Sequence, residues 1–248
     1  MNESSPWWGL KRYYRYERAT TRRQLEEVFR VRYDVYCREF GFERPEDCPG
    51  GRETDEYDAA SLHCLLRHAR SRQVAGCVRV ILPPDDGPGI PMAAYCEDSL
   101  DSGPLHPGNF PGDSVCEISR LAVTAAFRRR AGEQRSPAGQ PDHYSLGDRE
   151  ARTLPLIGIS MFVAAAALVR TANREHVYAM MEPKLARLLT RCGIHFQQIG
   201  GIVDYHGKRA PYYIHRPEAE RNGNADLQVL YGFMLDQLDD GNRSEAAS

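Results

Sequence analysis

VCEISRLAV, residues 115–123, is the stretch of sequence that decides the fold. It is a mostly apolar run with several β-branched side chains, which is typical of a buried strand. Two charged residues, Glu117 and Arg120, interrupt it. A charge inside a core strand costs free energy unless it is paired. We therefore expect partners for both on neighbouring strands, either in a structural ion-pair network or in a functional site.

A second apolar run with an internal charge lies upstream. GCVRVILP, residues 76–83, places Arg79 between Val78 and Val80. It forms the second half of a predicted hairpin with SLHCLLRH, residues 61–68. Arginines and acids on adjacent strands can satisfy one another, so Arg79 is a candidate partner for Glu117.

The rest of the chain alternates between strand-like and helix-like periodicity. Strands are predicted over residues 12–18, 61–68, 74–82, 115–123, 177–181, 195–200 and 210–215. Amphipathic or apolar helices are predicted over residues 22–40, 149–173, 183–191 and 226–238. This order predicts an α/β fold with one mixed central sheet flanked by helices. We expect a single domain over residues 1–217, with loop insertions near 83–113 and 128–148, followed by a C-terminal helix and acidic tail over 218–248.

Composition excludes several classes of protein. The chain has 248 residues, 32 of them Lys or Arg and 34 Asp or Glu, which gives a formal net charge of −2. No nucleic-acid partner is expected without a basic excess. The seven cysteines include no C-x-x-C pair, so we expect neither a zinc site nor a disulfide framework, but reduced thiols in a cytoplasmic protein. We expect no bound metal.

Motif absences narrow the chemistry further. The chain has no G-x-G-x-x-G, P-loop or G-x-S-x-G motif, which argues against dinucleotide, nucleotide and serine-hydrolase chemistry and predicts no bound cofactor. The longest apolar run, between Thr153 and Arg170, has 16 residues. A membrane span needs about 20, so we predict a buried core helix and no transmembrane segment.

Four segments, taken in order, resemble a known group of enzymes. They are RVRYDVYCREFGFE (30–43), DEYD (55–58), GCVRVILP (76–83) and EISRLAV (117–123). Together they are similar to the motifs of acyl-homoserine-lactone (autoinducer) synthases and N-acyl amino acid synthases, and in particular to acyltransferases associated with the PEP-CTERM/exosortase system. The resemblance spans residues 12 to about 215. It implies a GNAT-like (acyl-CoA N-acyltransferase) fold.

The resemblance also assigns candidate residues. The helix and its exit contribute Arg32, Tyr36 and Phe42, the acid pair is Asp55 and Asp58, and the strands contribute Arg79, Glu117, Ser119 and Arg120. Autoinducer synthases usually carry Phe at the position of Tyr36 and Trp at that of Phe42. These two changes favour an amino acid over S-adenosylmethionine as the acceptor.

The implied chemistry is aminolysis of a thioester, which needs placement, a proton acceptor and stabilisation of an oxyanion. Glu117 is the candidate base, with Arg79 and Arg120 beside it as catalytic residues. Backbone N–H groups near residues 121–124 are candidate oxyanion donors.

The resemblance also implies a set of substrate-binding residues. They are Arg32 for a carboxylate, Asp55 and Asp58 for an ammonium group, Ser119, and Tyr36 and Phe42 as pocket walls. For each, a purely structural role stays open. We expect the charged set to surround one cleft, with Arg79 and Glu117 close enough for a salt bridge or a shared partner.

An arginine-rich segment is a candidate binding site for the acyl donor. Arg129 to Gly132 gives only R-x-x-G of the GNAT phosphate loop, and residues 120–135 carry five arginines and one acid. Arg128, Arg129, Arg130 and Gly132 are therefore candidates for docking an acidic acyl carrier protein, with a solvated loop as the alternative.

The favoured function is transfer of a fatty acyl group from acyl carrier protein, or from coenzyme A, to the amino group of an amino acid or similar amine. Three alternatives are an acyl-homoserine-lactone synthase that uses S-adenosylmethionine, a non-catalytic module that binds an acyl ligand, and an ordinary acyl-CoA transferase.

Overall fold

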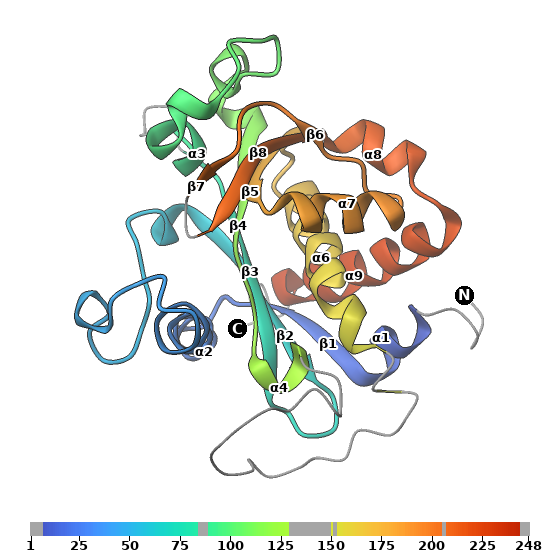
Figure 1. Cartoon of the computed structure of the whole chain (residues 1–248). Helices are drawn as coiled ribbons and strands as arrows, with labels where there is room; N and C mark the ends of the chain where they lie inside the picture. Colours follow the sequence, from blue (N-terminus) through green and yellow to red (C-terminus); the bar gives the residue numbers. More distant parts are fainter. Residues whose placement is uncertain (1–6, 84–88, 129–149, 151–152, 205–206, 244–248) are drawn as a thin grey trace.

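The computed structural model describes residues 7–83, 89–128, 150, 153–204 and 207–243. The strands of this part form one twisted sheet in the order β1-β2-β3-β4-β5-β8-β6, with β7 paired to β8 (Figure 1). Their bounds are β1 Tyr14–Arg18, β2 Ser61–His68, β3 Val74–Ile81, β4 Val115–Val123, β5 His176–Met181, β6 Gln197–Gln198, β7 Val203–Asp204 and β8 Lys208–His215. All the pairs are antiparallel except β4 with β5, which is parallel.

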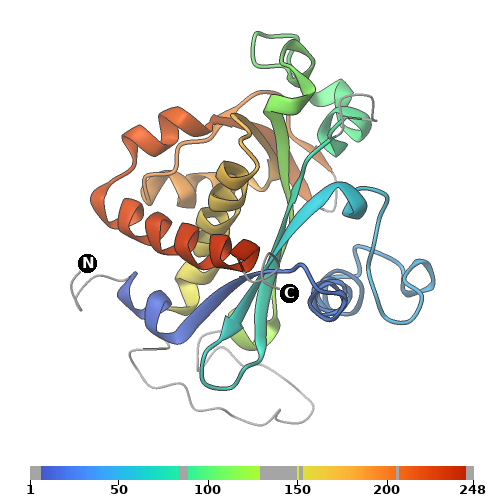
Figure 2. The same cartoon turned by 180° about the vertical axis from the view of Figure 1, so that it is seen from behind.

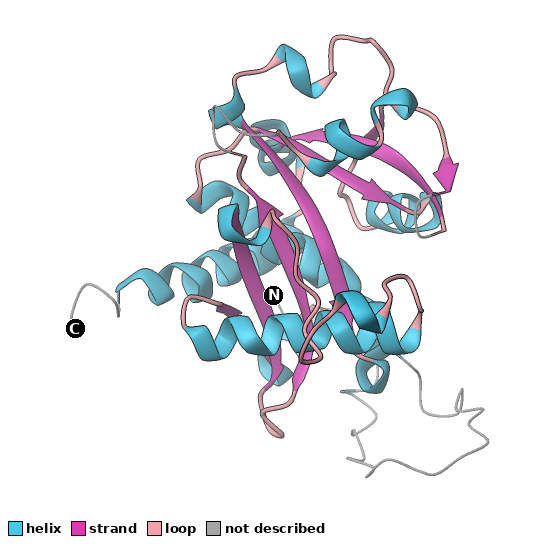
Figure 3. Cartoon of the chain, turned by 90° about the vertical axis from the view of Figure 1, so that its left-hand side faces the viewer, coloured by secondary structure: helices cyan, strands magenta, loops and turns pink. Residues whose placement is uncertain are grey.

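Helices cover both faces of the sheet. Those of the described residues are α1 Trp8–Tyr13, α2 Arg22–Arg32, α3 Pro91–Tyr95, α4 Ala125–Arg128, α6 Ile157–Thr171, α7 Pro183–Arg191, α8 Arg216–Asn222 and α9 Ala225–Arg243. Helix α2 lies on one face and α6 and α9 on the other (Figures 1 and 2). Seen from the α2 side, α2 crosses in front of the strands (Figure 3). The apolar core is largest between the sheet and α6, since 11 of the 15 residues of α6 are buried.

The predicted helix over residues 22–40 is confirmed, with a change of type along its length. Thr21 caps it, because its side chain accepts a hydrogen bond from the Gln24 backbone N–H. After Arg32 it continues as a π-helix over Tyr33–Glu39. The wider turn ends where the Phe40 N–H donates to the Val35 carbonyl. Such π turns are rare and occur often at functional sites.

A gap opens in the sheet between β4 and β5. The two strands pair over only three positions, from Val115 with His176 to Glu117 with Tyr178. Beyond that point β4 pairs only with β3, and β5 pairs only with β8. The edge of β4 that follows Glu117 therefore has no strand partner on the β5 side, and in this stretch the Leu121 carbonyl accepts a hydrogen bond from the Tyr36 hydroxyl.

A β-bulge in β4 sits beside this gap. The register with β3 shifts between Cys77 and Arg79, and Arg120 has a left-handed φ of 48°. Left-handed backbone is costly for a residue with a Cβ atom, and bulges re-aim side chains. Here the bulge lets Ser119 and Arg120, adjacent in sequence, both reach the same group of charged side chains.

Most predicted elements are confirmed, and the differences have local causes. Residues 12 and 13 end α1 instead of beginning β1. The apolar helix begins at Ile157, after a 3-10 turn with Pro155 near its start. Strand β7 and helices α1, α3, α4 and α8 are not predicted from the sequence, because each is too short to show a clear periodicity.

The C-terminal segment packs into the same core. Helix α8 spans residue 217, at which the domain is predicted to end. Helix α9 buries Leu230, Met234 and Leu238. Gln237 accepts a 3.0 Å hydrogen bond from the backbone N–H of Tyr16 in β1. In the part of the chain that is described, no helix has both the length and the apolar character needed to cross a bilayer.

Candidate active site

A cavity of about 660 Å³ lies at the gap between β4 and β5. Its floor is formed by β4 and the end of β5, and its walls come from the π-helix, α3, α6 and α7. One part of the lining is polar: Asp55, Arg79, Glu117, Ser119, Arg120, Arg128 and Arg209. Another part is apolar: Val123, Leu154, Phe162, Met181, Leu185 and Leu188. The cavity therefore fits an amphipathic ligand with a polar end and an apolar chain.

The Arg79 guanidinium is bound by three side-chain oxygen atoms. It lies 2.5 Å from an Asp55 oxygen, 2.8 Å from an Asp58 oxygen and 3.0 Å from Ser119 Oγ. The side chain is only 2% exposed. Its charge is therefore fully paired inside the protein.

Arg32 and Arg120 extend the same network. Arg32 on α2 pairs with Glu53, and its guanidinium lies 2.5 Å from Asp58. Arg120 lies 3.0 Å from Glu53 and 3.3 Å from Asp55. We call these six residues the paired network: Arg32, Glu53, Asp55, Asp58, Arg79 and Arg120. It joins α2, the 53–58 loop, β3 and β4.

The electrostatics of the network keep it ionised. Burial pushes the pKa of Asp58 upward, but Arg32 and Arg79 outweigh burial and lower that pKa to about 2. Burial likewise opposes ionisation of Asp55, and Arg79 lowers its pKa. The acids stay negative at neutral pH, so the network is a stable group of opposite charges.

Glu117 stands outside this network. It is 3% exposed, and one carboxylate oxygen accepts a 2.8 Å hydrogen bond from the backbone N–H of Met92. Among the described residues no cation lies within ion-pair distance of it. The expected salt bridge with Arg79 is absent because Asp55 and Asp58 already occupy that guanidinium. Burial raises the pKa of Glu117 to about 7. A carboxyl with such a pKa can accept or release a proton near neutral pH.

Aromatic side chains form the wall above the gap. The Tyr36 hydroxyl donates a 2.8 Å hydrogen bond to the Leu121 carbonyl, and the Arg120 guanidinium lies 5.7 Å from the Tyr36 ring centre. Phe42 stacks on Phe40 with ring centres 5.2 Å apart. Tyr36 and Phe42 thus lie at the cavity as the sequence predicts, and Phe40 joins them.

Arg32 and Asp58 are placed behind the cavity and not in its lining. Arg32 is fully buried, and the carboxylates that it holds are the protein's own. It therefore positions the 53–58 loop and does not line the cavity, and its predicted role in binding a substrate carboxylate stays a prediction. Asp55 does line the cavity, but two arginines already pair with it.

The arginine-rich segment is only partly described. Arg128, the last residue of α4, pairs with Glu39 and lies 4.7 Å from the Phe40 ring centre. Arg129, Arg130 and Gly132 lie outside the described residues, as does most of the loop 128–148. Docking of a carrier protein there remains a prediction.

Two residues of the site were missed from sequence. Glu53 is 3% exposed and holds Arg32 and Arg120; the acid-rich RETDEYD stretch contains it, but only the D-x-x-D spacing was recognised. His63 lies 3.8 Å from Asp58. Burial lowers the pKa of His63 to about 4, so it is neutral at pH 7. In the described part of the chain, no group of three metal-ligating side chains comes together.

Comparison with known proteins identifies the fold. Residues 31–136 match the family model for an acetyltransferase (GNAT) domain. The chain has a GNAT fold. No curated protein sequence matches the chain at a significant level.

Solved structures with the same fold include two kinds of synthase. The acyl-homoserine-lactone (AHL) synthase LasI has a TM-score of 0.55 and 18% identity, covering 88% of this chain and 93% of its own. FeeM, an N-acyl amino acid synthase from uncultured soil microbes, has a TM-score of 0.53 and 14% identity, covering 85% and 94%. BjaI, a CoA-dependent acyl-homoserine lactone synthase solved with SAM and isopentyl-CoA, has a TM-score of 0.54 and 20% identity, covering 89% of each chain. At these identities the likeness establishes the fold alone.

Proposed function

We propose that this protein is an acyltransferase that moves a fatty acyl group from a thioester to the amino group of an amino acid or similar amine. The observation that carries the proposal is Glu117. It is a buried carboxyl with its pKa raised to about 7, and it lies where β4 and β5 separate. Carboxyl groups in a cleft whose pKa is shifted from its ordinary value are characteristic of acid–base catalysis. The fold and its likeness to acyl-transferring synthases support the same class of reaction.

The proposed reaction is aminolysis of the thioester. The amine nitrogen attacks the thioester carbonyl carbon, the carbon–sulfur bond breaks, and the thiol leaves. Glu117 accepts the proton that the attacking amine loses, directly or through one water, and returns a proton to the leaving thiolate. The backbone of β4 beyond Glu117 has no strand partner on the cavity side. N–H groups on this edge can stabilise the oxyanion, although the Thr124 N–H is already bonded to Ala75.

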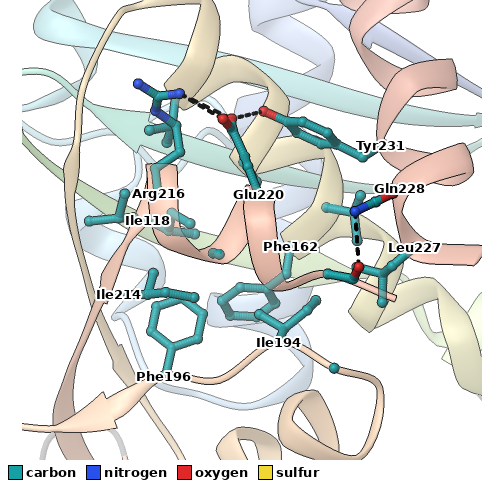
Figure 4. Close-up of a pocket in the computed structure, with 17 residues that line it drawn as sticks. Ile118, Phe162, Ile194, Phe196, Ile214, Arg216, Glu220, Leu227, Gln228 and Tyr231 are labelled. Atoms are coloured by element: carbon teal, nitrogen blue, oxygen red, sulfur yellow. Dashed lines mark hydrogen bonds and ion pairs between the residues drawn. The ribbon is translucent and has the colours of Figure 1, made fainter. Parts of the chain in front are cut away.

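The acyl chain has an apolar path away from Glu117. A second pocket of about 90 Å³ adjoins the cavity (Figure 4). Ile118 and Phe162 line both spaces. Other walls of this pocket are Phe196, Ile214 and Leu227. Burial of each methylene contributes about 0.8 kcal/mol. We therefore place the chain along α6, with its thioester beside β4.

The finer assignments are proposals from the sequence. They are the amino acid acceptor, acyl carrier protein as donor with coenzyme A as the alternative, no bound cofactor, the PEP-CTERM/exosortase association and a cytoplasmic location. Tyr36 and Phe42 at the cavity wall support an acceptor other than S-adenosylmethionine. A non-catalytic module is disfavoured, because a module that only binds a ligand does not need a buried carboxyl such as Glu117, which has no ion-pair partner among the described residues.

Mass spectrometry of lipids from bacteria that express the protein tests this proposal. Cells with the wild type should accumulate N-acyl amino acids, and cells with Glu117→Gln should not. Acyl-homoserine lactones in place of N-acyl amino acids would support the alternative synthase. No acylated amine in either strain, with the protein folded, would contradict acyl transfer to an amine.

A further inference from the structure

Four arginines of the described residues line the cavity, and they differ in one respect. Arg79 pairs with Asp55 and Asp58, and Arg120 pairs with Glu53. Arg128 pairs with Glu39. Their charges are therefore already balanced by the protein.

Arg209 is the exception. No described carboxylate lies within 4 Å of its guanidinium. Its Nε atom is buried without a hydrogen-bond partner; the same holds for Nε of Arg128, whose charge Glu39 balances. An unpaired guanidinium nitrogen taken out of water costs free energy, so buried donors of this kind almost always have a partner. A partner that the protein does not supply points to a ligand.

The position of Arg209 indicates which ligand group it meets. It lies near the start of β8, paired with Val203 of β7, and its neighbour Ala210 pairs with Met181 at the end of β5. The guanidinium carbon is 6.0 Å from the centre of the Phe42 ring. The positive charge also reaches Tyr36, since it acts to lower the pKa of that hydroxyl, which burial raises to about 12. Arg209 therefore faces the aromatic wall at which the acceptor amine is proposed to bind.

We propose that Arg209 binds the carboxylate of the acceptor, so that the acceptor is an amino acid with a free carboxylate. This rests on the proposed acyl transfer and adds the group by which the acceptor is recognised. A guanidinium offers two parallel N–H donors that match a carboxylate, and such charge-assisted pairs are strong and directional. The carboxylate would supply the missing partner of Nε and fix the amine toward Glu117.

Binding of product-like probes tests this without any turnover. Decanoylglycine carries the carboxylate, and decanoylglycinamide is its neutral counterpart; both can be titrated by calorimetry into the whole protein. The wild type should bind the acid at least about tenfold more tightly than the amide. Arg209→Gln should bind both alike, and Arg209→Lys should keep part of the preference. Arg191→Gln removes an exposed arginine of α7 outside the cavity, and it should keep all of the preference.

The outcomes separate this proposal from acyl transfer itself. Equal binding of acid and amide by the wild type would overturn the role of Arg209 and leave the acyl site standing. Binding of neither probe would overturn both. Decanoyl-pantetheine and decanoyl-4′-phosphopantetheine test the other source of an anion, the donor arm. A preference for the phosphorylated form that is lost in Arg209→Gln would assign Arg209 to the donor and overturn the acceptor carboxylate.

Discussion

The paired network, which includes Arg120 of β4, and Glu117 of the same strand are built in opposite ways. Each charge of the network has partners within ion-pair distance, whereas Glu117 receives one backbone hydrogen bond. Burial raises the pKa of Glu117, while arginines hold the pKa of Asp58 near 2. The comparison teaches that charge in a core strand has two uses. Charged residues that are paired with one another fix the shape of the site, and an ionisable residue without an ion-pair partner, such as Glu117, is available for proton transfer.

The sharpest way to break this comparison is Glu117→Gln. The amide keeps the size of the side chain and can still accept from Met92 N–H, but it cannot take the proton of the amine. We expect kcat/KM to fall by about 10²- to 10⁴-fold, measured as thiol release with the donor and amine that the lipid analysis identifies. The control Glu46→Gln changes an exposed acid and should leave the rate unchanged. A near-normal rate in Glu117→Gln would assign Glu117 to structure.

Arg32→Met tests the other side of the comparison. It removes a fully buried cation and leaves Glu53 and Asp58 with one arginine partner fewer each. Loss of one partner from a buried ion pair costs about 3–5 kcal/mol, so we expect a large drop in the free energy of unfolding by urea. Arg30→Met, in the same helix but exposed and paired with Glu26, should change stability little. Equal effects of the two variants would show that the network does not hold the fold.

The pH dependence of stability should differ in sign between the two regions. The folded pKa of Glu117 is about 7 against an ordinary value of 4.5, so its protonated form stabilises the fold below pH 4.5 and this contribution is lost as pH rises through 7. The loss amounts to about 3 kcal/mol, and Glu117→Gln should remove it. Network carboxylates such as Asp58, whose folded pKa is about 2, act in the opposite direction. Their contribution is present above pH 4 and disappears as pH falls toward 2.

Denaturant melts of the wild type and Glu117→Gln between pH 2 and 8 measure both limbs. Parallel curves from pH 4.5 to 8 would mean that Glu117 is ionised at its ordinary pKa, and the contrast between the regions would fail.

The smallest effect is expected at Arg128, which is paired but lies near the surface. Arg128→Glu places two negative charges together beside Glu39 and weakens the attraction for an acidic carrier protein. We expect a several-fold rise in KM for acyl carrier protein at low salt that fades above about 0.3 M, because steering is screened by ions. A salt-independent change, or none, would remove Arg128 from donor docking.

Much of the fold follows from sequence periodicity. Strands β2 and β4 lie at the predicted residues because their runs are mostly apolar and are bounded by turn residues. The charged residues inside β3 and β4 also signalled the site, since a core charge must have a reason. What periodicity could not supply is non-local. The separation of β4 from β5, the bulge at Arg120 and the choice of Asp55 over Glu117 as partner of Arg79 all depend on packing between distant segments.

Arg209 and Glu53 illustrate the same limit. In the sequence, Arg209 is one of the many arginines of the chain and lies in a polar stretch. Glu53 is one of several acids in the 53–58 segment. Only the burial of Glu53 and the lack of a carboxylate near Arg209 distinguish them, and both are properties of the folded chain.

The pH profile of kcat/KM tests the central claim most directly. It should be measured for the wild type and Glu117→Gln with an amine whose own pKa lies well away from 7. We expect a wild-type rate that rises with pH through an apparent pKa near 7, where Glu117 loses its proton, and a low profile without that step in the variant. A step near pH 7 that survives unchanged in Glu117→Gln would contradict the claim that this unpaired carboxyl is the base.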